Sequence, residues 1–414
     1  MTLLRIIDAS DTRAVDRLLA RGRPQDRALD RRVRHIVDGV RTGGDRALGR
    51  FARRFDHVTG SIEVSRDEMR DAAARVPPDV RRAIRQAARH IARVARRQLP
   101  KTTLTRVTRG VTVELRVEPL ASVGCYVPGG RFPLPSSLLM TAIPAQVAGV
   151  AEILVVCPRP EPAVMAAALE AGVSRLFRIG GAHAIAALAY GTPTIPRVDK
   201  IVGPGNRYVA AAKAYVAADC AIDFYAGPTE IVIVAGEGRP QLIAADLIAQ
   251  AEHDPDARAM LVTWKRSLAR RVAAAVGRVA SGRSIVEASL AANGAVIVTR
   301  TIDEAVALAN RIAPEHLVVD REAIARQRLT AGAVFVGPFT AQAAGDYATG
   351  SNHVLPTSGA SRFRGGLSAS DFVRVMSVQR LTRAGLARLA STIVPLARAE
   401  GLEAHAESIE VRLS

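Results

Sequence analysis

Hydrophobic positions in the first hundred residues recur with the spacing of helices. The segments at 14–22, 28–56 and 79–99 place apolar residues three or four positions apart, with Arg and Asp between them. Residues 102–130 then alternate Val and Thr with polar residues, which is typical of β-strands. We therefore expect a mainly helical N-terminal region that leads into strands.

From about residue 140 the pattern changes to short apolar runs separated by helical segments of ten or more residues. Short buried strands that alternate with helices are typical of βαβ units around a parallel sheet. The expected fold class is α/β, with two tandem incomplete Rossmann-like parallel-sheet domains, a helical N-terminal segment and a small C-terminal tail domain. The expected strands lie at 152–157, 175–180, 197–205 and 229–235 in the first series, and at 257–264, 294–300, 316–320 and 332–337 in the second.

The composition suits a protein with sizeable cores, since 49% of the 414 residues are hydrophobic. The formal net charge of +18 raises the alternative of a nucleic-acid-binding protein. However, the excess is nearly all Arg, because only four residues are Lys, and the Arg residues are scattered along the chain. We find no RRM, KH, helix-turn-helix or zinc-finger pattern. We therefore interpret the Arg residues as solvated helix faces and expect no nucleic-acid partner.

The three cysteines, Cys125, Cys157 and Cys220, have no paired spacing, which argues against a disulfide framework and for a reducing compartment. The first residues contain acids and no long apolar run, so no signal peptide is expected. The most apolar stretch, 138–157, is interrupted by Pro144, which argues against a membrane span. We expect a soluble cytoplasmic protein with no membrane partner.

Three Gly-rich turns follow expected strands, at 127–137, 179–184 and 202–206. Glycine permits close approach of the backbone, and the N–H groups of a following helix favour anions. At the carboxyl edge of a parallel sheet such turns bind nucleotides. None of them matches G-x-G-x-x-G or a Walker A motif, so each alone is also compatible with a simple tight turn. Three such turns in one unit favour a ligand.

Several polar residues are of the types that bind metals. Gln250 and His253 are three positions apart and share a face of a predicted helix. Asp346 and His353 lie in a polar, Gly-rich loop at 345–359, and His405 lies in the C-terminal tail. Histidine and carboxylates are common zinc ligands. Spacing alone does not unite these residues, and a lone histidine is more often structural.

Glu315 and His316 are adjacent between two apolar runs. Pro314 favours an extended conformation for Ala313. A carboxylate in apolar surroundings has a raised pKa, and an ordinary histidine titrates near neutrality, so the two could serve as base and acid. The alternative is a turn that faces solvent.

Eight segments between about residues 120 and 405 together resemble the histidinol dehydrogenase family and keep its order. The segments are GCYVPGGRFPLPSSLLM, GGAHAIAALAYGT, VDKIVGPGNRYVAAAK, IDFYAGPTE, AEHDPDA, IAPEHL, GDYATGSNHVLPTSG and EGLEAH. The first hundred residues add little to the resemblance.

The resemblance implies zinc-dependent, NAD-linked oxidation of L-histidinol to L-histidine through L-histidinal, in a homodimer whose active site is shared across the interface. It implies Glu315 and His316 as the catalytic pair. The zinc ligands that it implies are Gln250, His253, Asp346 and His405, and the NAD contacts are Tyr126, His183 and Asn206. The implied substrate contacts are Thr229, His353 and Glu400, together with the zinc ligands and His316.

Two positions depart from the family pattern, which usually has Gln in place of His183 and Ser in place of Thr229. These departures leave one alternative function. The protein would then be a sister zinc- and NAD-dependent dehydrogenase that acts on another amino alcohol, a polyol or a sulfonated C3 alcohol. Cys125 adjoins the cofactor turn and could form a thiohemiacetal with the aldehyde. The family pattern requires no thiol there, and we favour a packing role.

We expect the chain to divide into four parts. They are an N-terminal arm at 1–20, a first α/β domain at 21–123 plus 231–365, a second, NAD-binding α/β domain at 124–230, and a helical tail at 366–414 that contacts the partner subunit.

Overall fold

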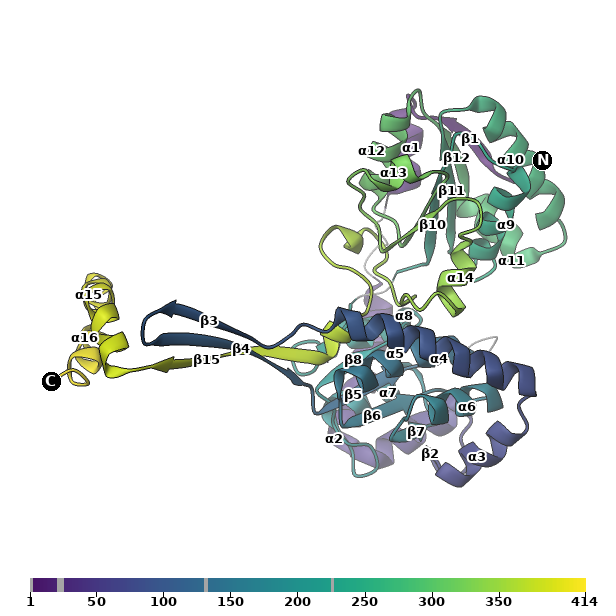
Figure 1. Cartoon of the computed structure of the whole chain (residues 1–414). Coiled ribbons are helices and arrows are strands. Elements are labelled where there is room, and N and C mark those ends of the chain that lie inside the picture. Colours follow the sequence, from purple (N-terminus) through teal and green to yellow (C-terminus); the bar gives the residue numbers. More distant parts are fainter. Residues whose placement is uncertain (1–2, 21–25, 130–132, 225–226) are drawn as a thin grey trace.

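The structure, a computed structural model, describes residues 3–20, 26–129, 133–224 and 227–414. Its strands form two six-stranded sheets and one three-stranded sheet, and the two larger sheets belong to separate α/β units that lie one above the other in Figure 1. Parts of two expected motifs, residues 130–132 of the turn at 127–137 and residues 225–226 of IDFYAGPTE, lie outside the described residues. The expected α/β class with two parallel-sheet units is confirmed.

The first sheet is parallel throughout. Its order is β1 (Arg5–Asp8), β12 (Ala295–Val298), β11 (Arg258–Thr263), β10 (Glu230–Val234), β13 (His316–Val319) and β14 (Ala333–Val336). Helices α9 (Pro240–Ala251), α10 (Arg266–Ala280) and α11 (Ser284–Asn293) cover one face, and α1 (Thr12–Leu19), α12 (Ile302–Ile312) and α13 (Glu322–Ala325) cover the other. All five residues of β10 are buried, as expected for a strand between two helical layers.

The second sheet is parallel except for one edge strand. Its order is β2 (Glu63–Val64), β7 (Arg175–Phe177), β6 (Glu152–Val156), β5 (Ser122–Tyr126), β8 (Lys200–Val202) and β9 (Ala221–Ile222), and β2 runs antiparallel to β7. Helices α3 (Arg66–Ala74), α4 (Pro78–Gln98), α5 (Pro135–Ala148) and α6 (Pro162–Glu170) cover one face. The other face is covered by α2 (Arg27–Phe51), α7 (Gly181–Tyr190) and α8 (Arg207–Val216), and the π-helical turn η1 (Ala52–Asp56) continues α2.

The third sheet and the last two helices form an arm that projects away from both units (Figure 1). The arm consists of the antiparallel strands β3 (Thr103–Thr108), β4 (Val111–Pro119) and β15 (Val373–Leu381), followed by α15 (Arg383–Ala399) and α16 (Glu403–Glu410). Two short 3₁₀ turns, η2 (Ala360–Arg362) and η3 (Ala369–Phe372), and helix α14 (Gln342–Tyr347) lie in the segment that leads to it. Apolar side chains are exposed along its strands, among them Leu104 at 67% and Val375 at 55%.

The packing differs from the expected division of the chain in four places. Strands β3 and β4, which we expected in the first α/β domain, belong instead to the arm. Residues 27–98 pack on the second sheet rather than joining 231–365, because the apolar faces of α2, α3 and α4 meet the helices and strands of that sheet. The expected N-terminal arm instead contributes β1, which pairs with β12. The expected helical tail begins with a strand, β15, that pairs with β4 along its whole length.

None of the helices within the described residues is long and apolar enough to cross a bilayer. The three cysteines are all free and buried, which agrees with the expectation that the chain has no disulfide framework.

Candidate active site

The catalytic candidates meet at the amino edge of the first sheet. Thr229 directly precedes β10, Glu315 directly precedes β13, and His316 is the first residue of β13. Because β10 and β13 pair in parallel with Ile231 opposite His316, the two strand starts lie side by side. Helix α14, which contacts the carboxyl end of α9, brings Asp346 to the same edge.

Glu315 lies in a closed, polar-lined position rather than in a turn that faces solvent. Its side chain is 9% exposed. Its Oε2 accepts a hydrogen bond from the Thr229 hydroxyl at 2.6 Å and one from the backbone N–H of Glu230 at 3.0 Å. Burial raises the pKa of Glu315 to about 8, although both hydrogen bonds act to lower it. The carboxyl is therefore largely protonated at neutral pH and becomes a base just above it.

Ala313, before Pro314, is not extended as expected. It adopts a left-handed conformation with φ 49° and ψ 62°, and its N–H caps α12 by bonding the carbonyl of Ala309. The helix ends in this way directly before the catalytic pair, because proline excludes the right-handed helical conformation from the residue before it. The expectation of an extended Ala313 was wrong.

The contacts of His316 define its tautomer. Nδ1 lies 3.3 Å from the carbonyl oxygen of Glu230, so Nδ1 carries the hydrogen and donates it. Nε2 lies 3.2 Å from the side-chain nitrogen of Gln342 and 3.9 Å from Asp346 Oδ1, so it presents a lone pair. Burial lowers the pKa of His316 to about 4 against the opposing effect of Asp346. The ring is therefore a neutral base at physiological pH.

Gln342 is a site residue that the sequence analysis missed. It is buried on α14, and its amide nitrogen donates to Asp346 Oδ2 at 2.8 Å while it faces His316. Asp346 lies in this helix, whereas we expected it in a loop at 345–359. The spacing of four between Gln342 and Asp346 was the available signal, since such a pair shares one helix face.

Three of the four expected zinc ligands lie together. His253 directly follows the C-cap of α9 and interacts electrostatically with His316, Asp346 and His353. Gln250 is fully buried, and its side-chain nitrogen donates to the Thr229 hydroxyl at 2.5 Å. In the part of the chain that the structure describes, Gln250 Oε1 is a buried oxygen without a hydrogen-bond partner.

An unpartnered buried oxygen is costly unless a ligand satisfies it. Together with a histidine and a carboxylate, this oxygen gives the mixed N and O donor set that suits zinc. Among the described residues, no three His, Cys, Asp or Glu side chains gather so that they could hold a metal. The donor types of Gln250, His253 and Asp346 therefore suit a zinc ion, but the described residues of one chain do not form a complete metal site.

The structure does not bring the last two expected residues, Glu400 and His405, to this edge. Both are exposed, Glu400 at the end of α15 and His405 on α16, at the far end of the arm. Figure 1 shows these helices well away from α14 and β10 of the same chain. Within one chain, therefore, these two residues do not join the other candidates.

His353 connects the two α/β units. Its Nδ1 lies 3.0 Å from the carbonyl oxygen of Asp346, and its Nε2 lies 3.4 Å from the hydroxyl of Ser137 on α5. Burial lowers the pKa of His353 to about 4, so the ring is neutral. His353, which we expected to contact substrate, thus lies between α5 of the second unit and Asp346 of the first.

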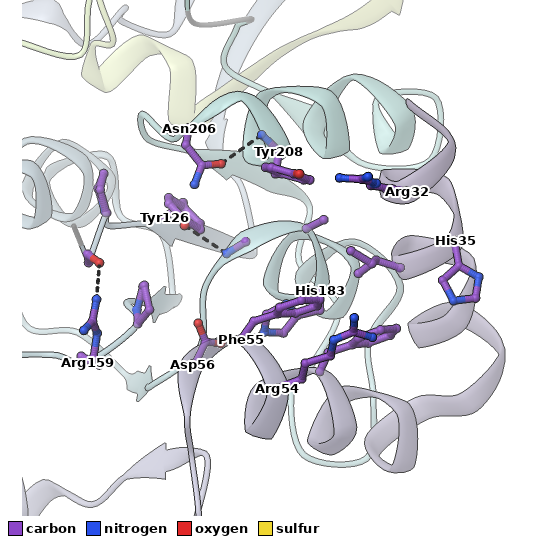
Figure 2. A pocket seen from close by; sticks show the side chains of 17 residues that line it. Arg32, His35, Arg54, Phe55, Asp56, Tyr126, Arg159, His183, Asn206 and Tyr208 are labelled. Atoms are coloured by element: carbon purple, nitrogen blue, oxygen red, sulfur yellow. Dashed lines mark hydrogen bonds and ion pairs between the residues drawn. The ribbon is translucent and has the colours of Figure 1, made fainter. Parts of the chain in front are cut away.

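The expected NAD contacts lie around a cavity of about 920 Å³ at the carboxyl edge of the second sheet. Tyr126, His183 and Asn206 all line it (Figure 2), beside the ends of strands β5 to β8. This edge, at the point where the strand order reverses, is where doubly wound sheets bind nucleotides, and the size is that of a cofactor site.

Inside this cavity, two backbone N–H groups at the start of α7 already donate hydrogen bonds to side chains of the same chain. Asp56 Oδ2 accepts the N–H of Gly180 at 3.1 Å and faces His183 Nε2 at 2.7 Å, and the Tyr126 hydroxyl accepts the N–H of Gly181 at 3.1 Å. The rings of Phe51 and Phe55 lie beside His183. The sequence analysis missed Asp56 and Phe55, because nothing local connects η1 with the turn at 179–184.

Cys125 is not placed for nucleophilic chemistry. It is fully buried in the core between β5 and its covering helices, and burial raises the pKa of its thiol to about 12. A thiol that stays protonated is a poor nucleophile. This supports the packing role that we favoured.

Comparisons with known proteins show to which family the chain is similar. A family model described as histidinol dehydrogenase matches residues 19–413. A histidinol dehydrogenase from Geobacter sulfurreducens is 45% identical over 428 residues, covering 99% of this chain and 100% of the relative. One from Haloarcula marismortui is 47% identical over 392 residues and covers 92% of each chain. A solved structure of histidinol dehydrogenase from Elizabethkingia anophelis aligns with a TM-score of 0.94 at 33% identity, covering 100% of this chain and 98% of that one.

Proposed function

The chain belongs to the histidinol dehydrogenase family, and we propose that it oxidises L-histidinol to L-histidine through L-histidinal, reducing NAD twice, in the biosynthesis of histidine. The observation that carries the proposal is the arrangement around His316. A neutral imidazole adjoins a buried carboxyl of raised pKa, and Gln250, which has an unpartnered oxygen, bonds the same Thr229 hydroxyl as that carboxyl. Alcohol oxidation needs a base, and aldehyde oxidation needs an activated water, and this pair offers both.

In the first oxidation His316 acts as the base. Its Nε2 lone pair takes the hydroxyl proton of histidinol while hydride leaves C1, and the aldehyde forms. The Nδ1–H bond to the Glu230 carbonyl keeps this tautomer and stabilises the ring once it is charged. The chemistry that NAD supplies is acceptance of the hydride at each oxidation.

In the second oxidation Glu315 acts first. Its carboxylate takes a proton from water as the water oxygen attacks the aldehyde carbon. At the same time His316, protonated in the first oxidation, gives its proton to the carbonyl oxygen, so that the hydrate forms and His316 is neutral again. His316, deprotonated again, then removes a hydroxyl proton from the hydrate while the second hydride leaves. The hydrogen bonds from Thr229 and from the Glu230 N–H orient Glu315 for this step.

Gln250, His253 and Asp346 would hold a zinc ion, with His405 of the partner subunit as the fourth ligand. The chemistry that zinc supplies is Lewis-acid orientation of the amino and imidazole groups of the substrate. Gln342 holds Asp346 by a hydrogen bond to Oδ2, which leaves Oδ1 for the site.

The arm supports a homodimer in which each copy completes the site of the other. Its exposed apolar strands carry side chains that a single chain leaves in water. Its end bears Glu400 and His405, which have no role within their own chain's site. The family resemblance assigns both to the partner's active site, and the missing fourth zinc ligand agrees with that assignment.

Mixed dimers test the sharing of the site. We would prepare His405→Asn and Glu315→Gln separately, each of which should be inactive in the oxidation of L-histidinal, and then unfold and refold them together and assay that reaction. Half of the dimers then pair one of each, and such a dimer has one site with both native residues, so activity should return to about a quarter of wild type. Activity that stays at zero in verified mixed dimers would contradict the sharing.

A product assay tests the function itself. We would follow NADH formation with L-histidinol, with and without a zinc chelator, against a polyol, another amino alcohol and a sulfonated C3 alcohol. The proposal expects two NADH per histidinol, loss of activity on chelation and recovery with zinc. A preference for another alcohol would favour the sister dehydrogenase that the departures at His183 and Thr229 keep open. The free, buried cysteines agree with a cytoplasmic location, which we also propose.

A further inference from the structure

A buried ion pair lies behind the Gly-rich turn at 202–206, outside the machinery described above. Lys213 on α8 and Asp223 after β9 are in direct contact, with their side chains 3% and 1% exposed. Burying two charges is costly, and replacing such a pair by apolar residues is often neutral or stabilising. Stability alone therefore gives little reason for this pair.

Both members of the pair bind the backbone of the same residue of the turn, Gly203. Asp223 Oδ2 accepts the N–H of Gly203 at 2.7 Å, and Lys213 Nζ donates to the carbonyl of Gly203 at 3.0 Å. The second oxygen of Asp223 accepts the N–H of Phe224 at 2.6 Å. Gly203 is thus held from its donor side and its acceptor side at once.

The conformation that the pair holds is one that few residues could adopt. Gly203 has φ +110°, and a Cβ there would lie 2.2 Å from the carbonyl oxygen of Tyr126. The turn therefore packs directly against the end of β5. It leads into Asn206, whose side-chain oxygen caps α8 by accepting the N–H groups of Tyr208 and Val209 at 3.0 and 3.2 Å. The amide nitrogen of Asn206 remains for the cavity that it shares with Tyr126 (Figure 2).

We propose that Lys213 and Asp223 are positioning residues for the dinucleotide: they lock the Gly203 turn, and through it they set Asn206 against Tyr126 in the cavity. This inference rests on the proposed function, which assigns that cavity to NAD. Neither residue touches the cavity, so both act through the turn.

Residues 223–224 also make contacts with the segment that leads to the arm. The carbonyl of Asp223 accepts a hydrogen bond from Arg364, whose guanidinium stacks on Phe224 and faces Asp371 at 3.5 Å. Lys200 of β8 donates to the Asp371 carbonyl at 2.8 Å. The turn is therefore anchored on one side to the sheet and on the other to the segment that precedes β15.

The experiment measures NADH affinity in two variants and a matched control. The first variant is Lys213→Met. The second combines Lys213→Met with Asp223→Asn, so that neither charge of the pair remains buried without its partner. The control is Arg175→Met combined with Glu63→Gln, which removes a bidentate ion pair from the opposite edge of the same sheet. We would titrate NADH by fluorescence, verify folding by circular dichroism and thermal unfolding, and measure kcat and KM for NAD.

The expected result is that the Kd for NADH rises about tenfold or more in both Lys213 variants, and that the control changes it by less than about twofold. The KM for NAD should rise in parallel, while kcat at saturating NAD stays within about threefold of wild type, because the catalytic edge is untouched. Lys213→Arg, which keeps a charged donor, should recover part of the affinity.

Three outcomes overturn the inference. Folded Lys213 variants that bind NADH with wild-type affinity would show that the Gly203 turn keeps its conformation without the ion pair. An equal loss in the control would show general softening of the sheet, and failure of both variants to fold would make the pair purely structural. A wild-type protein that binds no NADH would instead overturn the proposed function on which the inference rests.

Discussion

Replacing Glu315 with Gln separates the two half-reactions. The amide has the same shape, and its oxygen can still accept the hydrogen bonds from Thr229 and from the Glu230 N–H, so the site should keep its geometry. What the variant loses is a group that can take a proton from water. Aldehyde oxidation should therefore become slower, whereas His316, which we propose as the base for alcohol oxidation, remains.

The magnitude follows from the buried position of Glu315. With its pKa raised to about 8, roughly one carboxyl in eleven is ionised at pH 7 and roughly ten in eleven at pH 9, so wild-type histidinal oxidation should rise about tenfold between these values. Because the active form is the carboxylate, activity is lost as the pH falls through about 8. A positioned general base contributes about 10²- to 10⁴-fold, and histidinal oxidation by the variant should fall within that range.

The assay supplies each half-reaction separately. NADH formation from L-histidinal reports the second oxidation, and the first turnover with L-histidinol, followed by rapid mixing, reports the first. We expect histidinol oxidation to fall by less than about tenfold, and the rise of histidinal oxidation with pH to disappear. Equal losses in both half-reactions, or a pH dependence that persists in the variant, would refute the assignment of Glu315 to the hydration step.

Three further predictions follow from neighbouring groups. Thr229→Val removes a hydrogen bond that lowers the pKa of Glu315, so the rise of histidinal oxidation should move to higher pH, and a pH–rate profile that does not move would contradict this contact. Cys125→Ser should retain histidinal oxidation, because a buried thiol with a pKa of about 12 is not a nucleophile, and loss of that activity in a folded variant would restore the thiohemiacetal alternative. Burial raises the pKa of Asp246 to about 6, so the folded state favours its protonated form, and the stability this provides at low pH is lost as the pH rises through about 6. Asp246→Asn should therefore raise the free energy of unfolding by about 1–2 kcal/mol at pH 8 and change it little at pH 4, as measured by urea titration.

The sequence carried enough information for the two α/β units and for most of the site. Buried strands and amphipathic helices have different periods, and these are local properties that survive in any tertiary arrangement. The expected strand at 229–235 appears as β10, and the expected strand at 316–320 appears as β13. Adjacency in the sequence was also sufficient to single out Glu315 and His316.

Tertiary structure alone decided which distant segments share a face. The apolar pattern of helices α2 to α4 would suit packing on either sheet. In the structure their apolar faces pack on the second sheet, a choice among several apolar surfaces that the pattern does not record. Strand β15 lies in a stretch that we expected to be helical, and it becomes a strand because β4 offers a full-length partner. Gln342 and Asp56 join their sites only through folding, since each contacts residues that no local pattern links to it. His405 is the extreme case, because its partners belong, in our proposal, to another copy of the chain, and no periodicity within one sequence records a contact between two molecules.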